Sequence, residues 1–238
     1  MTTRSTGNAT GTGNATGDGN ATGAGNATGA GSGPGPGAGD DDRRRRILEA
    51  TWQLIAERGF HSVRIADIAR ACGTSTGTVH YHFPGKNDVL AEALKYCVSR
   101  AFARQSTELR AIDDAHARML KLIDLQLPRL GQVRDEWSIW LQYWAEAAIR
   151  PEFRPAHNEY YDRWQDTVRR IARRGQRQGV FREDADPDVV ALRLTALTDG
   201  AAIQVLTGVR GMTVSTMREL LVEQVARELL PAPDPVPA

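Results

Sequence analysis

The sequence has few of the features that specify secreted, membrane-spanning or disulfide-stabilised proteins. Only two cysteines occur in 238 residues, Cys72 and Cys97, and both fall at apolar positions of helical patterns. They predict buried thiols in a reducing, cytoplasmic compartment, not a disulfide framework. No run of about 18 apolar residues stands out, so we expect no membrane contact through a spanning helix. The N-terminus also lacks the apolar segment of a secretory signal.

Large apolar residues are missing from the N-terminal fifth of the chain. Between Met1 and Ile47 there is no Leu, Ile, Val, further Met or aromatic residue, and residues 7–30 repeat a GNATG unit four times. Such a segment cannot bury enough apolar surface to offset its chain entropy. We therefore expect residues 1–42 to form a disordered, Gly-rich tail and residues 231–238 a flexible C-terminus.

Motifs for catalysis and metal binding are absent as well. The chain contains no HExxH, Walker A or GxSxG pattern. His80 and His82 are two residues apart, which places them on different faces of a helix and makes them a poor metal-binding pair. The sequence therefore predicts a protein that is not an enzyme and that needs no cofactor and no metal.

Charge is unevenly distributed along the chain. The net charge is only +1, yet residues 43–104 contain eleven Lys and Arg against five Asp and Glu. A basic block in a nearly neutral chain favours a local anionic partner such as nucleic acid. The alternative is a solvated helical surface that is rich in arginine.

Apolar residues recur with a period near 3.6 throughout residues 43–230, and no segment alternates as a strand would. Asp186 followed by Pro187 is typical of a helix start, and Thr213 or Ser215 is a suitable cap for the last helix. About nine helices result, so the fold class is all-α.

Two of these helices are short and closely spaced. The pattern predicts helices at about 64–72 and 75–83, joined by a tight turn at Gly73. This is the spacing of a helix-turn-helix, whose second helix can enter the major groove. Val79 and Phe83 would face the core. The candidate DNA-binding side chains are Ser75, Thr76, Gly77, Thr78, His80, Tyr81 and His82, followed by Lys86 for a phosphate.

The text "ILEATWQLIAERGFHSVRIADIARACGTSTGTVHYHFPGKNDVLAEAL" closely resembles the DNA-binding region of TetR-family transcriptional regulators. Residues 74–83 and the tryptophans that follow are most similar to the BetI-like branch. The resemblance implies a DNA-binding domain at 43–100, an effector-binding and dimerisation domain at 101–230, and repression from a palindromic operator of double-stranded DNA. Arg64 stands where relatives usually have Ser or Thr as a helix cap, and we expect it to reach the DNA backbone instead.

The resemblance also implies a homodimer through the last two helices. The predicted helix after Pro187 is apolar on more than one side, and such a helix needs two buried faces. One face would contact its own domain and the other a second copy of the chain.

Aromatic residues gather in the predicted sixth and seventh helices, where Tyr161 also lies. Because aromatic faces attract cations, we expect a small-molecule effector that is a cationic, choline-like amine. The alternative is an aromatic core. The candidate effector-binding residues are Glu136, Trp137, Trp140, Tyr143, Trp144, Tyr160, Trp164 and Asp199.

The sequence as a whole predicts a ligand-responsive, DNA-binding transcriptional regulator. Two other functions compete with it: a non-catalytic helical adaptor that has lost DNA binding and, less favoured, a small-molecule enzyme.

Overall fold

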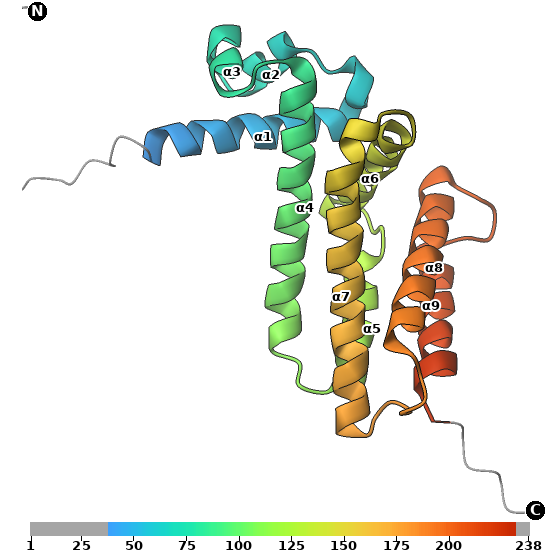
Figure 1. Cartoon of the computed structure of the whole chain (residues 1–238). Helices are drawn as coiled ribbons and strands as arrows, with labels where there is room; N and C mark the ends of the chain where they lie inside the picture. Colours follow the sequence, from blue (N-terminus) through green and yellow to red (C-terminus); the bar gives the residue numbers. More distant parts are fainter. Residues whose placement is uncertain (1–37, 232–238) are drawn as a thin grey trace, which may run out of the picture. The chain divides into compact units, whose positions relative to one another are not determined.

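Residues 38–231 are described by the computed structural model; they form nine α-helices, two short 3-10 helices and no strand (Figure 1). The all-α fold class expected from the periodicity is confirmed. The elements are α1 (Ala38–Arg58), η1 (Phe60–Ser62), α2 (Ile65–Ala71), α3 (Thr76–His82), α4 (Lys86–Arg110), α5 (Ala115–Gln126), α6 (Gln132–Ile149), η2 (Pro151–Phe153), α7 (Arg154–Gln178), α8 (Pro187–Thr207) and α9 (Val214–Leu229).

The apolar side chains of α1, α2 and α3 form one core with the first half of α4. Ile47 and Val79 are fully buried there, and Phe83 is almost fully buried. The same core includes Tyr143 from the second half of α6 and Phe153 from η2. The N-terminal helices are therefore not an isolated unit, because α6 completes their core.

A second core lies between α5, α7, α8 and α9. Val168, Leu194 and Leu221 are buried in it, together with Phe181 from the turn after α7. The Phe181 ring lies against Gly175, where an added Cβ would come within 1.9 Å of Cδ2. Glycine is required at this position because no other residue leaves room for the ring.

Local signals determine where several helices begin and end. Gly73, with a φ of +64°, closes α2 in a Schellman motif, with Thr74 N bonded to Ala69 O and Gly73 N bonded to Arg70 O. Asp186 caps α8 by accepting from Asp188 N, and Thr213 caps α9 by accepting from Thr216 N. The predicted starts of these last two helices are therefore confirmed.

Helix α1 begins earlier than the sequence suggested. It starts at Ala38, five residues inside the segment expected to be a tail. Asp40 and Asp41 occupy its first turn, where carboxylates stabilise the helix dipole, and Asp42 pairs with Arg45 and Arg46. The rest of the predicted tail, 1–37, and residues 232–238 lie outside the described residues.

Helix α8 is more apolar than the sequence analysis allowed. An 18-residue window within Pro187–Thr207 has a mean hydropathy of 1.5, so this one helix is long and apolar enough to cross a membrane by length and composition. A core helix of a soluble protein passes the same criterion. Val190, Leu194 and Ala201 are buried in the second core, whereas Leu192 is 60% exposed on another side.

Candidate functional site

Helix α3 presents a polar face to solvent. Ser75, Thr76, Gly77 and His80 are exposed, and Thr78 is half-buried. Ser75 caps the helix, because its Oγ accepts a hydrogen bond from Thr78 N at 3.1 Å. These short side chains leave the backbone of α3 accessible to a large partner.

Tyr81 is the most prominent side chain of this face. It is 77% exposed, whereas Val79 and Phe83 on the opposite side are buried. Arg44 of α1 lies over the Phe83 ring at 5.1 Å, which ties the end of α3 to α1 by a cation–π contact. An exposed aromatic ring on a rigidly held helix is a suitable contact for a base or sugar in a groove.

His82 differs from the expectation that it faces DNA. Its side chain is only 3% exposed, and its Nε2 lies 3.7 Å from Asp40 Oδ1 at the start of α1. The early start of α1 explains the difference, because the first turn of that helix covers the end of α3. His82 is therefore not available to an outside partner, and its Nε2 has no hydrogen-bond partner within the described residues.

Gly77 has no structural reason to be glycine within the described residues. A Cβ at this position would meet only Ser75 Oγ, at 3.6 Å, which is an ordinary contact. Glycine within a helix nevertheless costs stability relative to alanine. A bare backbone on the exposed face is consistent with close approach by a partner from outside.

Arg64 and Lys86 flank the helix-turn-helix. Arg64 is exposed, and its side chain makes no cap bond; Asp67 Oδ2 instead accepts from Arg64 N at 3.2 Å. Lys86 donates from Nζ to His61 O at 2.9 Å. Arg64 thus remains accessible to a phosphate, whereas Lys86 already binds a backbone carbonyl.

An aromatic pocket opens between α4, α6, α7 and α8. It encloses about 540 Å³ of empty space, including its mouth. Five predicted aromatic residues and Asp199 line it, and Trp140 meets the Tyr160 ring edge-on at 5.6 Å. The lining residues are Val98, Ala101, Phe102 and Gln105 of α4, Gln126 of α5, Trp137, Trp140 and Trp144 of α6, Tyr160, Tyr161 and Trp164 of α7, and Thr195, Thr198 and Asp199 of α8.

Asp199 is the acidic group of this pocket. Burial raises its pKa to about 6, and the Tyr161 hydroxyl, which donates to Oδ2 at 2.7 Å, opposes that rise. Burial and the neighbouring carboxylate together raise the pKa of Tyr161, so the phenol keeps its proton. The pocket therefore combines aromatic walls with one poorly solvated carboxyl group.

Two residues predicted to bind an effector lie outside the pocket lining. Glu136 forms a bidentate ion pair with Arg104, with N–O distances of 2.5 and 2.8 Å, and also accepts from Gln132. Tyr143 is buried and donates to Phe153 O at 2.6 Å. Both expectations differ from the structure, since these polar groups are occupied by partners from α4 and η2.

The sequence analysis missed several pocket residues. Those on α4, including Phe102 and Gln105, fall within the predicted effector-binding region 101–230 but were missed, because the prediction relied on the aromatic residues of two later helices and the carboxylates near them. Thr195 and Thr198 did carry one, since they lie about one turn or less before Asp199 on the same helix.

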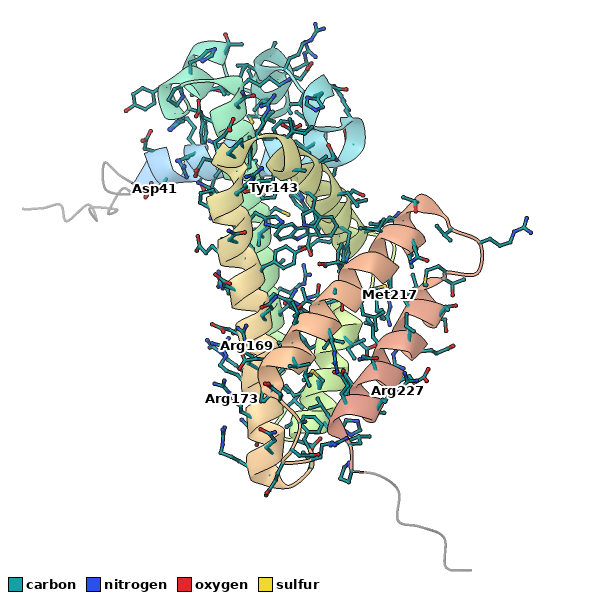
Figure 2. All side chains as sticks on the ribbon, turned by 45° about the vertical axis from the view of Figure 1, so that its right-hand side comes forward. Asp41, Tyr143, Arg169, Arg173, Met217 and Arg227 are labelled. Carbon is teal, nitrogen blue, oxygen red and sulfur yellow. The ribbon has the colours of Figure 1, made fainter. Side chains whose placement is uncertain are left out.

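Helix α6 connects the pocket with the N-terminal helices. Gln142 Oε1 accepts from Phe60 N, and Nε2 donates to Ile55 O at 3.4 Å. Glu146 Oε1 lies 2.9 Å from His61 Nε2. Figure 2 places Tyr143 near the end of α6 that meets these N-terminal helices. Any shift of α6 caused by a ligand would therefore act on the turn between α1 and α2.

Comparisons with known proteins agree with this architecture. Residues 47–93 match the model of bacterial regulatory proteins of the tetR family, and residues 115–230 match the C-terminal region of BetI-type transcriptional repressors. Both matches fall within the two regions that the sequence suggested.

Three individual proteins illustrate the similarity. A protein from Saccharomonospora viridis, described as a transcriptional regulator and solved in complex with choline, is 52% identical; the match covers 81% of this chain and all of that one, with a TM-score of 0.76. The HTH-type transcriptional regulator PksA of Bacillus subtilis is 25% identical over 70% of this chain and 80% of its own length. BetI 1 of Chromohalobacter salexigens is 25% identical over 79% of this chain and 90% of its own.

Alanine at position 77 should separate folding from DNA binding. Gly77→Ala is expected to raise the free energy of unfolding by roughly 0.5–1 kcal/mol, because the space around it is open. It should weaken binding to a duplex selected from a random pool by about fivefold or more, a cost of roughly 1 kcal/mol. Denaturant unfolding and fluorescence anisotropy measure the two effects.

The matched control is Gly39→Ala, which also adds a methyl group to an exposed, open position in a helix. It should leave DNA affinity unchanged. Wild-type affinity in Gly77→Ala would show that α3 does not approach DNA through this residue.

Proposed function

The chain belongs to the TetR family of transcriptional regulators, with a BetI-type C-terminal region, and from this premise we propose that it is a repressor released from DNA by a quaternary ammonium ligand, choline or a close analogue. The observation that carries the proposal is the half-buried Asp199 carboxyl among aromatic walls. The choline complex of the 52% identical relative supports the same ligand class.

A quaternary ammonium group suits this pocket for a physical reason. It carries a positive charge but no N–H donor, so it gains little from hydrogen-bond acceptors and much from aromatic faces. Trp140, Trp144 and Tyr160 supply such faces, and the Asp199 carboxylate supplies the opposite charge.

The proposed DNA contacts come from the exposed face of α3. Ser75, Thr76, Gly77, Thr78, His80 and Tyr81 are accessible there, with Arg64 nearby for a phosphate. His82 is left out of the proposed contacts because its side chain is buried. Helix α3 would lie in the major groove and read base edges with its short polar residues.

A homodimer through α8 and α9 is part of the proposal. Val189 and Leu192 are exposed on α8, at 37% and 60%, and Ala196 follows one turn later on the same side. Burying this apolar face against a second copy removes it from water. A two-fold dimer presents two copies of α3 and so favours a palindromic operator.

The competing functions predict different behaviour. An adaptor would bind no DNA, whereas a regulator loses affinity for DNA steeply as the salt concentration rises, with a slope near −0.9 for each neutralised phosphate.

A location in the cytoplasm, where both the DNA and reduced cysteines are found, is part of the same proposal. Cys72 and Cys97 form no disulfide.

The decisive experiment compares choline with its carbon isostere, in which a neutral tert-butyl group replaces the trimethylammonium group. Choline should displace the labelled operator duplex at a concentration about tenfold or more below that of the isostere, since a desolvated cation–π contact contributes roughly 2 kcal/mol. Fluorescence anisotropy follows the release. Equal potency of the two compounds would rule out recognition of the positive charge.

Choline affinity should depend on pH through Asp199. The carboxyl group must lose its proton to attract the cation, and the pKa of Asp199 is raised to about 6 in the free protein. Affinity should therefore be highest above pH 7 and about tenfold lower at pH 5. Isothermal titration calorimetry across this range measures the affinity. The number of protons released to the buffer for each choline bound should be smaller above pH 6 than at pH 5.

Asp199→Asn is the control for this pH dependence. The amide has nearly the same shape but does not titrate, so its choline affinity should be low and nearly constant between pH 5 and 7. An equally steep pH profile in the variant would assign the titration to another group.

Gln142 should couple the pocket to the DNA-binding helices. Gln142→Ala removes the bonds to Phe60 and Ile55 without touching the pocket. We expect choline affinity to stay within about twofold, while choline weakens DNA binding about fivefold less than in the wild type. Ser138→Ala is the matched control, because the Ser138 hydroxyl bonds only to Arg134 O within α6. An unchanged response in Gln142→Ala would mean that the signal travels by another route.

A further inference from the structure

A second cavity lies beside the aromatic pocket, between α4, α5 and α7. It encloses about 790 Å³ of empty space, including its open side. Four arginines line it, and no acidic residue does. The lining residues are Phe102, Gln105, Ser106, Leu109, Arg110, Arg118, Arg163, Thr167, Arg170 and Ile171.

The four arginines lack carboxylate partners among residues 38–231. No ion pair within 4.0 Å involves Arg110, Arg118, Arg163 or Arg170 in that range. Neighbours on the same helix are paired: Arg169 with Asp166 and Asp188, and Arg174 with Asp113. Arg110, Arg163 and Arg170 are exposed and Arg118 is half-buried, so water screens part of their mutual repulsion, but an anion between them would be attracted by all four.

The positions of these arginines are constrained by their surroundings. Arg163 lies over the Phe102 ring at 4.6 Å, and Arg118 Nε donates to Ile112 O at 2.7 Å. Burial, together with the charge of Arg174, lowers the pKa of Arg118. Two of the guanidinium groups are therefore held in place by contacts within the chain, which leaves less entropy to lose when an anion binds.

Gln105 points to the same conclusion from a different observation. It is buried, with 8% of its surface exposed, and it makes no side-chain hydrogen bond within residues 38–231. It lines both cavities, as does Phe102. Its amide therefore faces the cavities and is free to bind a group in either of them, so these two residues form the boundary at which two bound groups would meet.

We propose that this arginine-lined cavity is an oxyanion site, for a phosphate or carboxylate group, next to the ammonium site of the aromatic pocket. Arginine binds such groups through paired N–H donors. The anion is carried by the molecule whose ammonium group occupies the aromatic pocket, or it is a separate ion. The ammonium half of this arrangement rests on the function proposed above, but the anion half stands on the arginines alone.

The test uses calorimetric titration of the full chain with choline, phosphocholine and inorganic phosphate. The cavity variant is Arg110→Gln combined with Arg170→Gln, two exposed arginines of the lining. The matched control is Arg173→Gln combined with Arg177→Gln, which removes the same charge from exposed positions of α7 outside the lining; Arg173 is labelled in Figure 2. Thermal unfolding checks that each variant is folded, and Arg170→Gln alone replaces the double variant if that one is not.

Two results would support the site. In the first, phosphocholine binds the wild type about tenfold more tightly than choline, and the cavity variant loses this gain while keeping its choline affinity. In the second, phosphocholine binds no more tightly than choline, but inorganic phosphate binds the wild type and the control and not the cavity variant. The first result assigns the anion to the effector, and the second to a separate ion.

Other results would overturn the site or the effector, and they can be told apart. If phosphocholine binds no more tightly than choline and phosphate shows no binding below about 10 mM, the cavity is not an oxyanion site. The same follows if the cavity variant and the control bind phosphate equally. If phosphate binds through the arginines but choline does not bind at all, the proposed effector is wrong and the anion site stands.

Discussion

The structure depends on one packing constraint: α6 must complete two cores at once. Its Trp137 side lies in the bundle core, and its Tyr143 side lies in the core of the N-terminal helices. Trp140 packs against both. Close-packed interiors transmit displacements because neighbouring side chains have nowhere else to go. A helix shared in this way cannot respond to a ligand on one side without changing what it contacts on the other, and Gln142 adds a directional bond to the turn after α1.

The two neighbouring cavities contain unpaired groups of opposite charge. The aromatic pocket contains the Asp199 carboxyl with only a phenol as partner, and the neighbouring cavity contains arginines without carboxylates. By contrast, Arg104 and Glu136 form an ion pair between α4 and α6. A half-buried carboxyl group with one neutral partner lowers stability, whereas water partly screens the arginines, three of which are exposed. A ligand that supplies the missing charges would recover that free energy, which is the physical basis of a specific response.

The recognition helix could be predicted largely from local pattern. Gly73 marks the turn, Ser75 the cap, and the spacing of Val79 and Phe83 the buried side, so the exposed residues follow by elimination. His82 escaped this reasoning because the side chain that covers it belongs to a segment assigned to the tail. For the pocket, residue type was informative, since the aromatics and Asp199 do meet, but Glu136 was misassigned because its partner Arg104 is 32 residues away.

By itself, the sequence determined the helices and their order, because period, caps and breakers act over a few residues and need no distant partner. It also determined that a short polar helix would follow the turn at Gly73. Only the tertiary structure decided which polar groups are left over once the helices pack. A carboxylate or guanidinium becomes functional through the absence of a neighbour, and the neighbours of Asp199, Glu136 and Arg163 come from other helices.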